Sequence, residues 1–387
     1  PRLAAGQEGK MPAPWAFGRR PGRRGEGMSG MRRKAIVAGM AMGLALASSA
    51  RAQSGAPAAG VKMTEEVYKN IQVLKGIPAD QLLPTMQFIA TALGTQCNHC
   101  HVQGANDRDD KTPKEFARIM MKMVFAINQG TFGDRMAITC YTCHHGNLRP
   151  AVTPEPAEMG RPSQAPGLVG NQPSASQMLD KYLQAVGGES AIAQITSRVA
   201  KGTLQSAANN PAAVEIYVKA PDKGLIVTHI LGTDSSTGYS GNAGWTSSPD
   251  RGTSDLTAAD TEGAMLEDGL YLAANAKKLY QWRVAAPERM GDKNVYVLDG
   301  SARGHVPVRL YLDQQTGLLL RMTHFLDTPL GRLPTQVDYD DYREVDGVKA
   351  PFRISAIRPN TRTTVQLDRV EQNVPVEDAK FTKPSAP

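Results

Sequence analysis

The sequence predicts a multidomain chain in which a mostly α-helical part precedes a mainly antiparallel β part that begins with helices. Three observations support this prediction. Apolar residues recur with helical spacing over 62–147. They alternate as in strands over much of 175–387. Six prolines fall within 148–174, which indicates an extended linker between the two parts.

The first 52 residues have the composition of an export signal. Basic residues at 32–34 precede an apolar run at 35–47, and an Ala-x-Ala pattern follows at 50–52. The run is shorter than the roughly 18–20 residues that a membrane-spanning helix needs. We therefore expect export to the periplasm with the leader removed. An uncleaved leader would instead anchor the protein to the membrane.

The basic charge of the chain belongs to this leader. The whole chain carries a formal net charge of +7, whereas residues 1–52 contain ten Lys and Arg and two acidic residues, a net +8. The remaining residues therefore sum to −1. A chain without a basic excess gives no electrostatic argument for binding nucleic acid, and we expect no such partner.

Three segments of the first part have helical spacing: 64–74, 83–94 and 112–128. In the second of these, Pro84 suits the first helical turn and Gly94 suits the C-terminal end. In the third, Thr112 and Glu115 have the spacing of a capping box, which predicts that Thr112 caps the helix.

The second part is expected to begin with a helix over 176–188 and a shorter one over 189–195. After these the hydrophobic period changes to two. Strands are predicted over five segments: 214–220, 224–230, 295–300, 308–325 and 348–357. Residues 312–319 are expected to form a tight hairpin. These elements predict an antiparallel sheet with one or two helices at its N-terminal end.

All four cysteines lie in two copies of one motif, CNHCH and CYTCH. C-x-x-C-H is the attachment sequence of c-type haem, because two thiols add to the two vinyl groups of the porphyrin and the histidine ligates the iron. The motifs predict two covalently bound haem c groups, one held by Cys97, Cys100 and His101 and the other by Cys140, Cys143 and His144.

Two other kinds of site also use the C-x-x-C spacing. Four thiolates could bind zinc, although a zinc site would not need the histidine that follows each pair. A dithiol redox pair needs only one C-x-x-C, and its usual β-α-β context is missing from the predicted elements. Both alternatives remain open beside haem.

The sixth ligand of each iron is expected to be a methionine. A thioether opposite histidine raises the potential of the iron and suits electron transfer, although methionine also commonly fills hydrophobic cores. Five methionines lie between 86 and 136: Met86, Met120, Met121, Met123 and Met136. A methionine-bearing helix therefore precedes each attachment motif.

Two stretches, LLPTMQFIATALGTQCNHCHV and ARIMMKMVFAINQGTFGDRMAITCYTCHHG, resemble the cytochrome c subunit of photosynthetic reaction centres. The resemblance covers residues 61–146. It implies that Met86, 11 residues before Cys97, ligates the first iron and that Met120 ligates the second, with Met121 and Met123 as the other candidates. That subunit carries four haems and this chain has two motifs, so the resemblance implies no photosynthetic partner.

The stretches VRLYLDQQTGLLLRM and DYDDYREVDGVKAPFRI are similar to periplasmic lipoprotein-sorting domains. Those domains are curved antiparallel half-barrels with a helix against the concave face. The resemblance implies that the concave face holds a lipid, a quinone or a partner. A likeness of fold does not give a function.

Taken together, these features predict a periplasmic electron carrier that is not an enzyme. Its partners are expected to be redox proteins in the periplasm or at the membrane. Two other functions stay open. One is a peroxidase-like haem enzyme in which one iron keeps an open coordination position. The other is a redox-sensing binding module that uses the β part.

Overall fold

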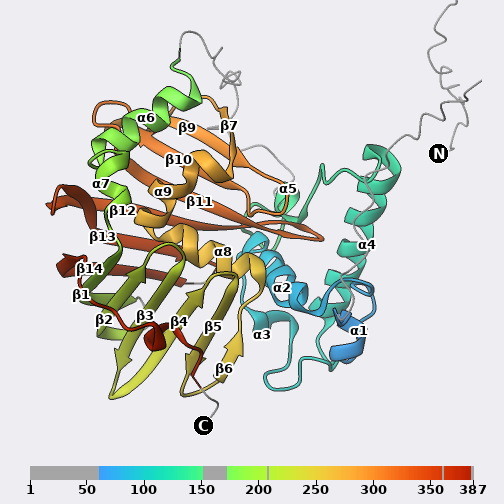
Figure 1. The fold of residues 1–387 in the computed structure, drawn as a ribbon. Helices are drawn as coiled ribbons and strands as arrows, with labels where there is room; N and C mark the ends of the chain where they lie inside the picture. The colour runs from blue at the N-terminus through green and yellow to red at the C-terminus, as the bar shows by residue number, and fades with distance from the viewer. Residues whose placement is uncertain (1–60, 151–171, 207–208, 360, 385–387) are drawn as a thin grey trace, which may run out of the picture. The chain divides into compact units, whose positions relative to one another are not determined.

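The computed structural model describes residues 61–150, 172–206, 209–359 and 361–384, apart from the side chains of 209 and 210 (Figure 1). The predicted leader and most of the predicted linker lie outside these residues. None of the helices in the described residues combines the length and apolar character that crossing a membrane requires.

The first part consists of short helices joined by loops, with one long helix among them. Its elements are α1 (Thr64–Val67), η1 (Ala79–Gln81), α2 (Leu82–Ala92), α3 (Cys97–Cys100), α4 (Thr112–Phe132) and α5 (Cys140–His144). The predicted helices over 83–94 and 112–128 are confirmed by α2 and α4.

The helix predicted over 64–74 ends at Val67, so this prediction is wrong over most of its length. The backbone becomes extended at Tyr68, and Asn70 adopts a left-handed conformation with φ of 58°. The chain then folds back, because the Thr64 hydroxyl donates to the carbonyl of buried Leu74 at 2.5 Å. The apolar spacing that predicted a helix therefore comes from a loop packed on α1.

The capping-box prediction for α4 is also wrong. Lys111 is the N-cap and makes no side-chain cap, while Thr112 is the first residue of the helix. Glu115 instead forms an ion pair with Arg118 one turn later. At the other end α4 extends beyond the predicted segment and stops at Gly133, whose φ of 60° favours glycine.

The β part contains one antiparallel sheet of fourteen strands. They are β1 (Ser197–Ser206), β2 (Asn209–Lys219), β3 (Lys223–Ile230), β4 (Thr233–Ser240), β5 (Ala243–Ser248), β6 (Gly252–Asp255), β7 (Gln281–Val284), β8 (Glu288–Met290), β9 (Lys293–Ser301), β10 (Val308–Asp313), β11 (Leu319–Thr328), β12 (Gly331–Val345), β13 (Val348–Arg358) and β14 (Thr361–Gln372). The order runs from β6 through β1 and β14 to β7, and β8 pairs with β9. The end strands β6 and β7 do not pair, so the sheet stays open.

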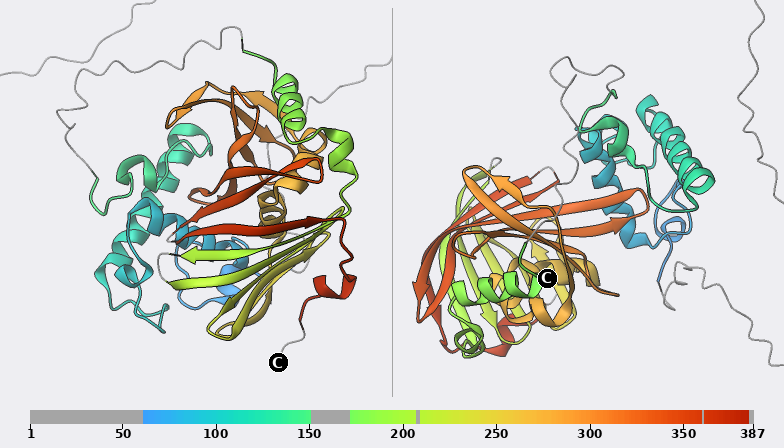
Figure 2. Two further views of the ribbon diagram at one scale, coloured as in Figure 1. Left: turned by 90° about the vertical axis from the view of Figure 1, so that its left-hand side faces the viewer. Right: turned by 90° about the horizontal axis from the view of Figure 1, so that it is seen from above.

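The sheet curves around helices on its concave side (Figure 2). The helices of this part are α6 (Ala175–Ala185), α7 (Glu189–Ala193), α8 (Ala258–Glu267), α9 (Gly269–Leu279) and η2 (Asp378–Phe381). Helices α6 and α7 were predicted. Helices α8 and α9, which connect β6 to β7, were not predicted.

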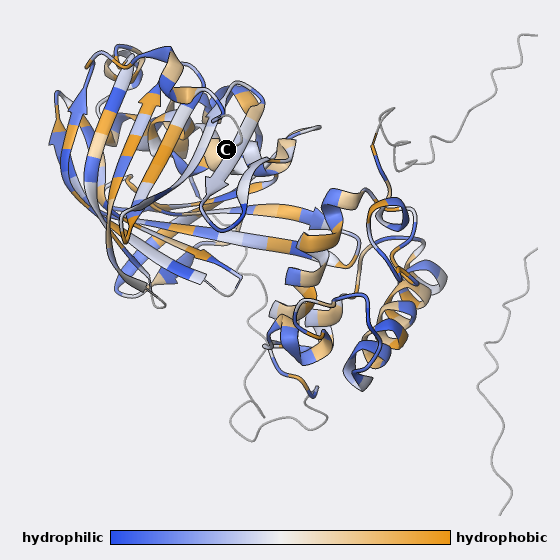
Figure 3. Cartoon of the chain, turned by 90° about the horizontal axis from the view of Figure 1, so that it is seen from below, coloured by the Kyte–Doolittle hydropathy of each residue, from blue (hydrophilic) through white to orange (hydrophobic). Residues whose placement is uncertain are grey.

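Apolar and polar residues alternate along the strands, so that one face of the sheet is apolar (Figure 3). The main core forms where this face meets α6, α8 and α9, with Leu266, Leu298 and Met322 fully buried. One cavity beneath the helices is about 20 Å³ and is lined by Tyr182 and Arg198 among others. That volume suits one water molecule.

The β11–β12 hairpin contributes to the core of the helical part, and both parts belong to one compact unit. At the hairpin end, Leu330 is 0% exposed and Leu333 is buried. Both pack in one cluster with Phe88 of α2 and Met121 of α4. The helical part therefore relies on side chains that come more than 180 residues later in the chain.

We predict that Leu330→Ala lowers the free energy of unfolding by about 2–5 kcal/mol, because it leaves a cavity in this core. The matched control is Leu231→Ala at the β3–β4 turn, where the leucine is 91% exposed. Its effect should stay within about 0.5 kcal/mol. Urea unfolding followed by circular dichroism measures both. Equal effects of the two substitutions would show that the hairpin end is not packed.

Candidate functional site

The first motif lies at a cavity of about 580 Å³. Helix α3 supplies Cys97 and Cys100, and His101 follows directly. All three line the cavity together with Met86 and Met121. The structure therefore brings the four residues predicted for the first haem to one cavity, whose volume is in the range of small-molecule and cofactor sites.

Helix α2 places Met86 at this cavity. Met86, Ile89, Ala90 and Leu93 recur at helical spacing and all line it. The opposite side of α2 carries buried Phe88 and Ala92, which pack in the core of the helical part. The amphipathic pattern of α2 thus fixes which side of the helix faces the cavity.

The ring of His101 is oriented by a backbone carbonyl. Its Nδ1 lies 2.9 Å from the carbonyl oxygen of Asn106. A carbonyl oxygen can only accept, so Nδ1 carries the hydrogen and donates it. The lone pair on Nε2 is therefore left for a metal, which is the arrangement that metal-ligating histidines use.

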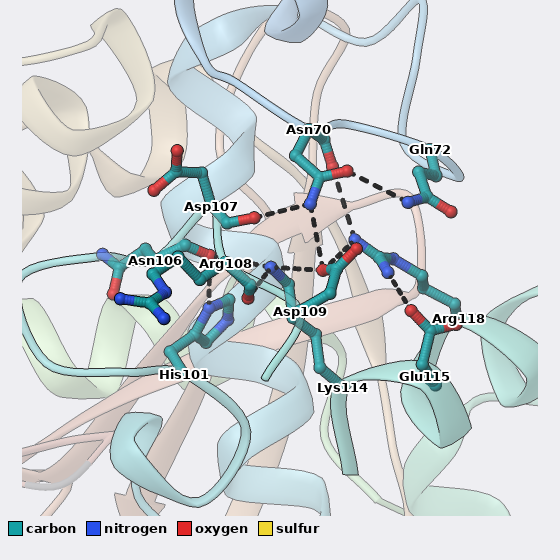
Figure 4. Close-up of polar contacts among 10 residues, drawn as sticks. All are labelled: Asn70, Gln72, His101, Asn106, Asp107, Arg108, Asp109, Lys114, Glu115 and Arg118. Atoms are coloured by element: carbon teal, nitrogen blue, oxygen red, sulfur yellow. Dashed lines mark hydrogen bonds and ion pairs between the residues drawn. The ribbon is translucent and has the colours of Figure 1, made fainter. Parts of the chain in front are cut away.

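A buried lysine holds the loop that contains this carbonyl (Figure 4). The ammonium of Lys114 donates to the carbonyls of Asn106 at 2.9 Å and Arg108 at 2.7 Å, and pairs with Asp109 Oδ1 at 2.9 Å. An ammonium has three N–H groups, and these three contacts use all of them. The side chain of Lys114 is 11% exposed, so helix α4 fixes the loop firmly.

Asp109 joins three segments of the helical part. Its Oδ1 accepts from Arg118 at 2.9 Å and from the Asn70 amide at 2.9 Å, besides pairing with Lys114. The Arg118 guanidinium, the Asn70 amide and Lys114 hold the pKa of Asp109 well below its usual range. These residues carry no motif. The sequence feature that could have indicated them is the spacing of Lys114, Arg118 and Met121, which places all three on one face of α4.

The second motif repeats part of this geometry. Helix α5 carries Cys140, Cys143 and His144. The Nδ1 of His144 lies 2.9 Å from the carbonyl oxygen of Asn147, so this ring too donates from Nδ1 and leaves Nε2 free. Cys140 is buried and Cys143 is exposed.

Helix α4 also places the second motif. The side-chain oxygen of Asn128 accepts from the backbone N–H groups of Ala137 and Ile138, each at 3.0 Å. Its amide nitrogen donates to the Ile138 carbonyl at 2.8 Å. One side chain thereby fixes the loop that leads into α5.

The two motifs are joined through their flanking backbone. The N–H of Gly146 donates to the carbonyl of Ala92 at 2.9 Å. Gly94 follows α2 with φ of 61°, and a Cβ there would lie 1.9 Å from the Gly146 carbonyl oxygen. Only glycine fits this contact, which lies three residues before Cys97 and two after His144.

The methionines of α4 divide between two faces. Met121 is buried and lines the first cavity. Met120 and Met123 are 39% and 42% exposed and lie on another face with Phe116 and Ile119. Of the three candidates for the second iron, Met120 and Met123 thus lie away from the first cavity and Met121 lies at it.

Exposed apolar side chains concentrate in the helical part. Eleven of the thirteen large exposed hydrophobic residues among the described residues lie between 61 and 148. Four of them, Phe116, Ile119, Met120 and Met123, share one face of α4, and an exposed apolar face of this kind marks a candidate binding area. A large apolar group held against this surface would cover it, so the residues present fit covalently bound haem.

Among the described residues, no three His, Cys, Asp or Glu side chains gather in a way that could hold a metal ion. Burial raises the pKa of the Cys100 and Cys140 thiols.

The Asp109 contacts predict how stability depends on pH. A carboxyl group in an unfolded chain has a pKa of about 3.9. Since the folded pKa of Asp109 is lower, its stabilising contribution is present above about pH 4 and is lost as the pH falls further. Asp109→Asn should lower the free energy of unfolding near neutral pH.

This loss should shrink below about pH 4, because the unfolded wild-type chain then binds a proton at Asp109 that the folded protein does not bind, and the wild-type advantage falls. Urea unfolding from about pH 7 down to about pH 3 measures it. Asp110→Asn, which removes an exposed partner of Arg108, is the control. A loss for Asp109→Asn that does not change with pH would contradict the role given to this carboxylate.

Known proteins resemble the two parts of the chain separately. Residues 13–179 match the family model of the photosynthetic reaction centre cytochrome c subunit. The subunit of Thermochromatium tepidum is 38% identical over 89 residues, which cover 22% of this chain and 22% of that protein. The subunit of Roseobacter denitrificans is 31% identical over 107 residues, which cover 24% of this chain and 28% of that protein. The chain therefore matches about a quarter of the length of these relatives.

Among solved structures, a LolA superfamily protein from Nitrosomonas europaea matches with a TM-score of 0.38 and 14% identity, over 55% of this chain and 99% of that one. A putative outer membrane lipoprotein-sorting protein domain from Vibrio parahaemolyticus matches with a TM-score of 0.36 and 12% identity, over 52% of this chain and 97% of that one.

The family match and these relatives cover the segment with both attachment motifs. That segment is similar to the cytochrome c subunit of photosynthetic reaction centres, a family of c-type haem electron carriers.

Proposed function

We propose that this protein is a periplasmic electron carrier with two covalently bound haem c groups. One observation carries the proposal: Met86, Cys97, Cys100 and His101 line the same cavity of about 580 Å³. The second motif supports it, because His144 repeats the Nδ1–carbonyl hydrogen bond of His101 at the same length of 2.9 Å.

Each group of residues has a distinct role in this proposal. The thiols of Cys97, Cys100, Cys140 and Cys143 form the covalent attachment. His101 and His144 present Nε2, because their Nδ1 hydrogens are already donated to carbonyls. Bound haem iron carries one electron by changing between the ferric and ferrous states. Met86 and Met120 would each supply a thioether ligand to the iron, which would favour the ferrous state and suit a carrier rather than an enzyme.

The contact between Ala92, Gly94 and Gly146 supports direct electron exchange between the two sites. It joins the segment before the first motif to the segment after the second. The β part contributes Leu330 and Leu333 to the same core, which favours a docking or supporting role for this part. Redox partner proteins in the periplasm or at the membrane are the proposed partners. A lipid or quinone bound by the β part is a further proposed partner.

We predict that Met86→Ala converts one of two low-spin haems to high spin, because the iron loses its thioether ligand. Met121→Ala, at the same cavity, should leave both haems low spin. Magnetic circular dichroism of the holoprotein detects the change. A high-spin signal in Met121→Ala and none in Met86→Ala would assign the ligand to Met121 instead.

The second iron is tested in the same way. Met120→Ala should convert the other haem to high spin, and Met123→Ala, which removes an equally exposed methionine from the same face of α4, should not. The reverse result would move the ligand to Met123. A high-spin haem in the unaltered protein would contradict the electron-carrier proposal and favour the peroxidase-like enzyme.

A further inference from the structure

We propose that Lys114 raises the reduction potential of the haem at 97–101 by competing with His101 for the carbonyl oxygen of Asn106. This inference rests on the proposed function and deepens it. It makes Lys114 a positioning residue, which acts on the iron through His101 and not by contact with it. It also makes the two haems unequal although their motifs are alike.

The two histidines have the same hydrogen bond but different surroundings. The Asn106 oxygen accepts from His101 Nδ1 and from Lys114 Nζ, both at 2.9 Å. The Asn147 oxygen accepts from His144 at 2.9 Å, and no Lys or Arg of the described residues donates to it. One histidine therefore shares its acceptor with a cation and the other does not.

Sharing the acceptor changes the basicity of the histidine. The stronger the hydrogen bond from Nδ1, the more basic Nε2 becomes as a metal ligand. Two donors on one oxygen draw on the same electron density, so the ammonium weakens the bond that His101 makes. A less basic histidine stabilises ferric iron less, and the potential of that haem rises.

The position of Lys114 is fixed, so this effect does not average out. Its three N–H groups are all used, by two carbonyls and Asp109. Its side chain is 11% exposed, which limits screening by solvent. Asp109 lies 2.9 Å from the ammonium and offsets much of its long-range charge. The competition for the carbonyl is therefore the larger part of the effect.

The test is a potentiometric titration of the full-length protein with both haems attached. Lys114→Gln should shift the potential of one haem to lower values and leave the other unchanged. The chain with Cys140→Ser and Cys143→Ser, which keeps only the first attachment site, identifies which haem has shifted. Lys122→Gln removes the same charge from the exposed side of α4 and should shift neither.

A second variant protects the test against a misfolded Lys114→Gln protein. Asp109→Asn removes the counter-ion of Lys114. The ammonium then donates a stronger hydrogen bond to the Asn106 carbonyl, so the potential of the same haem should rise. The nuclear magnetic resonance signal of the His101 Nδ1 hydrogen should move in opposite directions in these two variants, which a general loss of structure would not produce.

Two attached haems with unchanged potentials in both variants would overturn this inference and leave the electron-carrier proposal standing. An equal shift in Lys122→Gln would also overturn it, since the effect would then be one of general charge. Absence of covalent haem from the unaltered protein would instead overturn the proposed function.

Discussion

The contacts of Asp109 with Lys114, Arg118 and Asn70 are the constraint on which the first site depends. The loop between His101 and α4 has no regular structure, so side chains from α4 must fix it. Lys114 holds two of its carbonyls, and one of these orients the imidazole of His101. The network thus fixes the loop whose carbonyl sets the tautomer and direction of His101.

Helix α4 organises both candidate sites from its two faces. Its buried face carries Lys114, Arg118 and Met121 toward the first cavity. Another face carries Met120 and Met123 in exposed positions, and Asn128 near its end fixes the approach to α5. A straight helix of 21 residues can do this because its side chains repeat every 3.6 residues.

The attachment residues could be predicted from the sequence because the chemistry of thioether attachment fixes their spacing. Long periodic elements such as α4 and β13 were predictable for a similar reason, since a repeated apolar pattern has one consistent interpretation. The network around Asp109 could not be predicted. It joins Asn70 and Asp109, which lie in loops, to Arg118 of α4, and no local pattern encodes contacts between segments so far apart in the sequence.

Two other features also depend on contacts distant in sequence. The segment 64–74 has a helical pattern but folds back on Thr64, because burial of Leu74 outweighs its helical tendency. Helices α8 and α9 lie between strands, and their apolar residues are buried by a sheet that is completed only by later strands. Tertiary packing decides both features.

The most direct test of this account is the intact mass of the denatured protein, produced together with the machinery that attaches haem, alongside its iron and zinc content. The account predicts a mass equal to that of the polypeptide plus two haem groups. It also predicts an iron content of two atoms per chain. A polypeptide without added mass that retains zinc would contradict it.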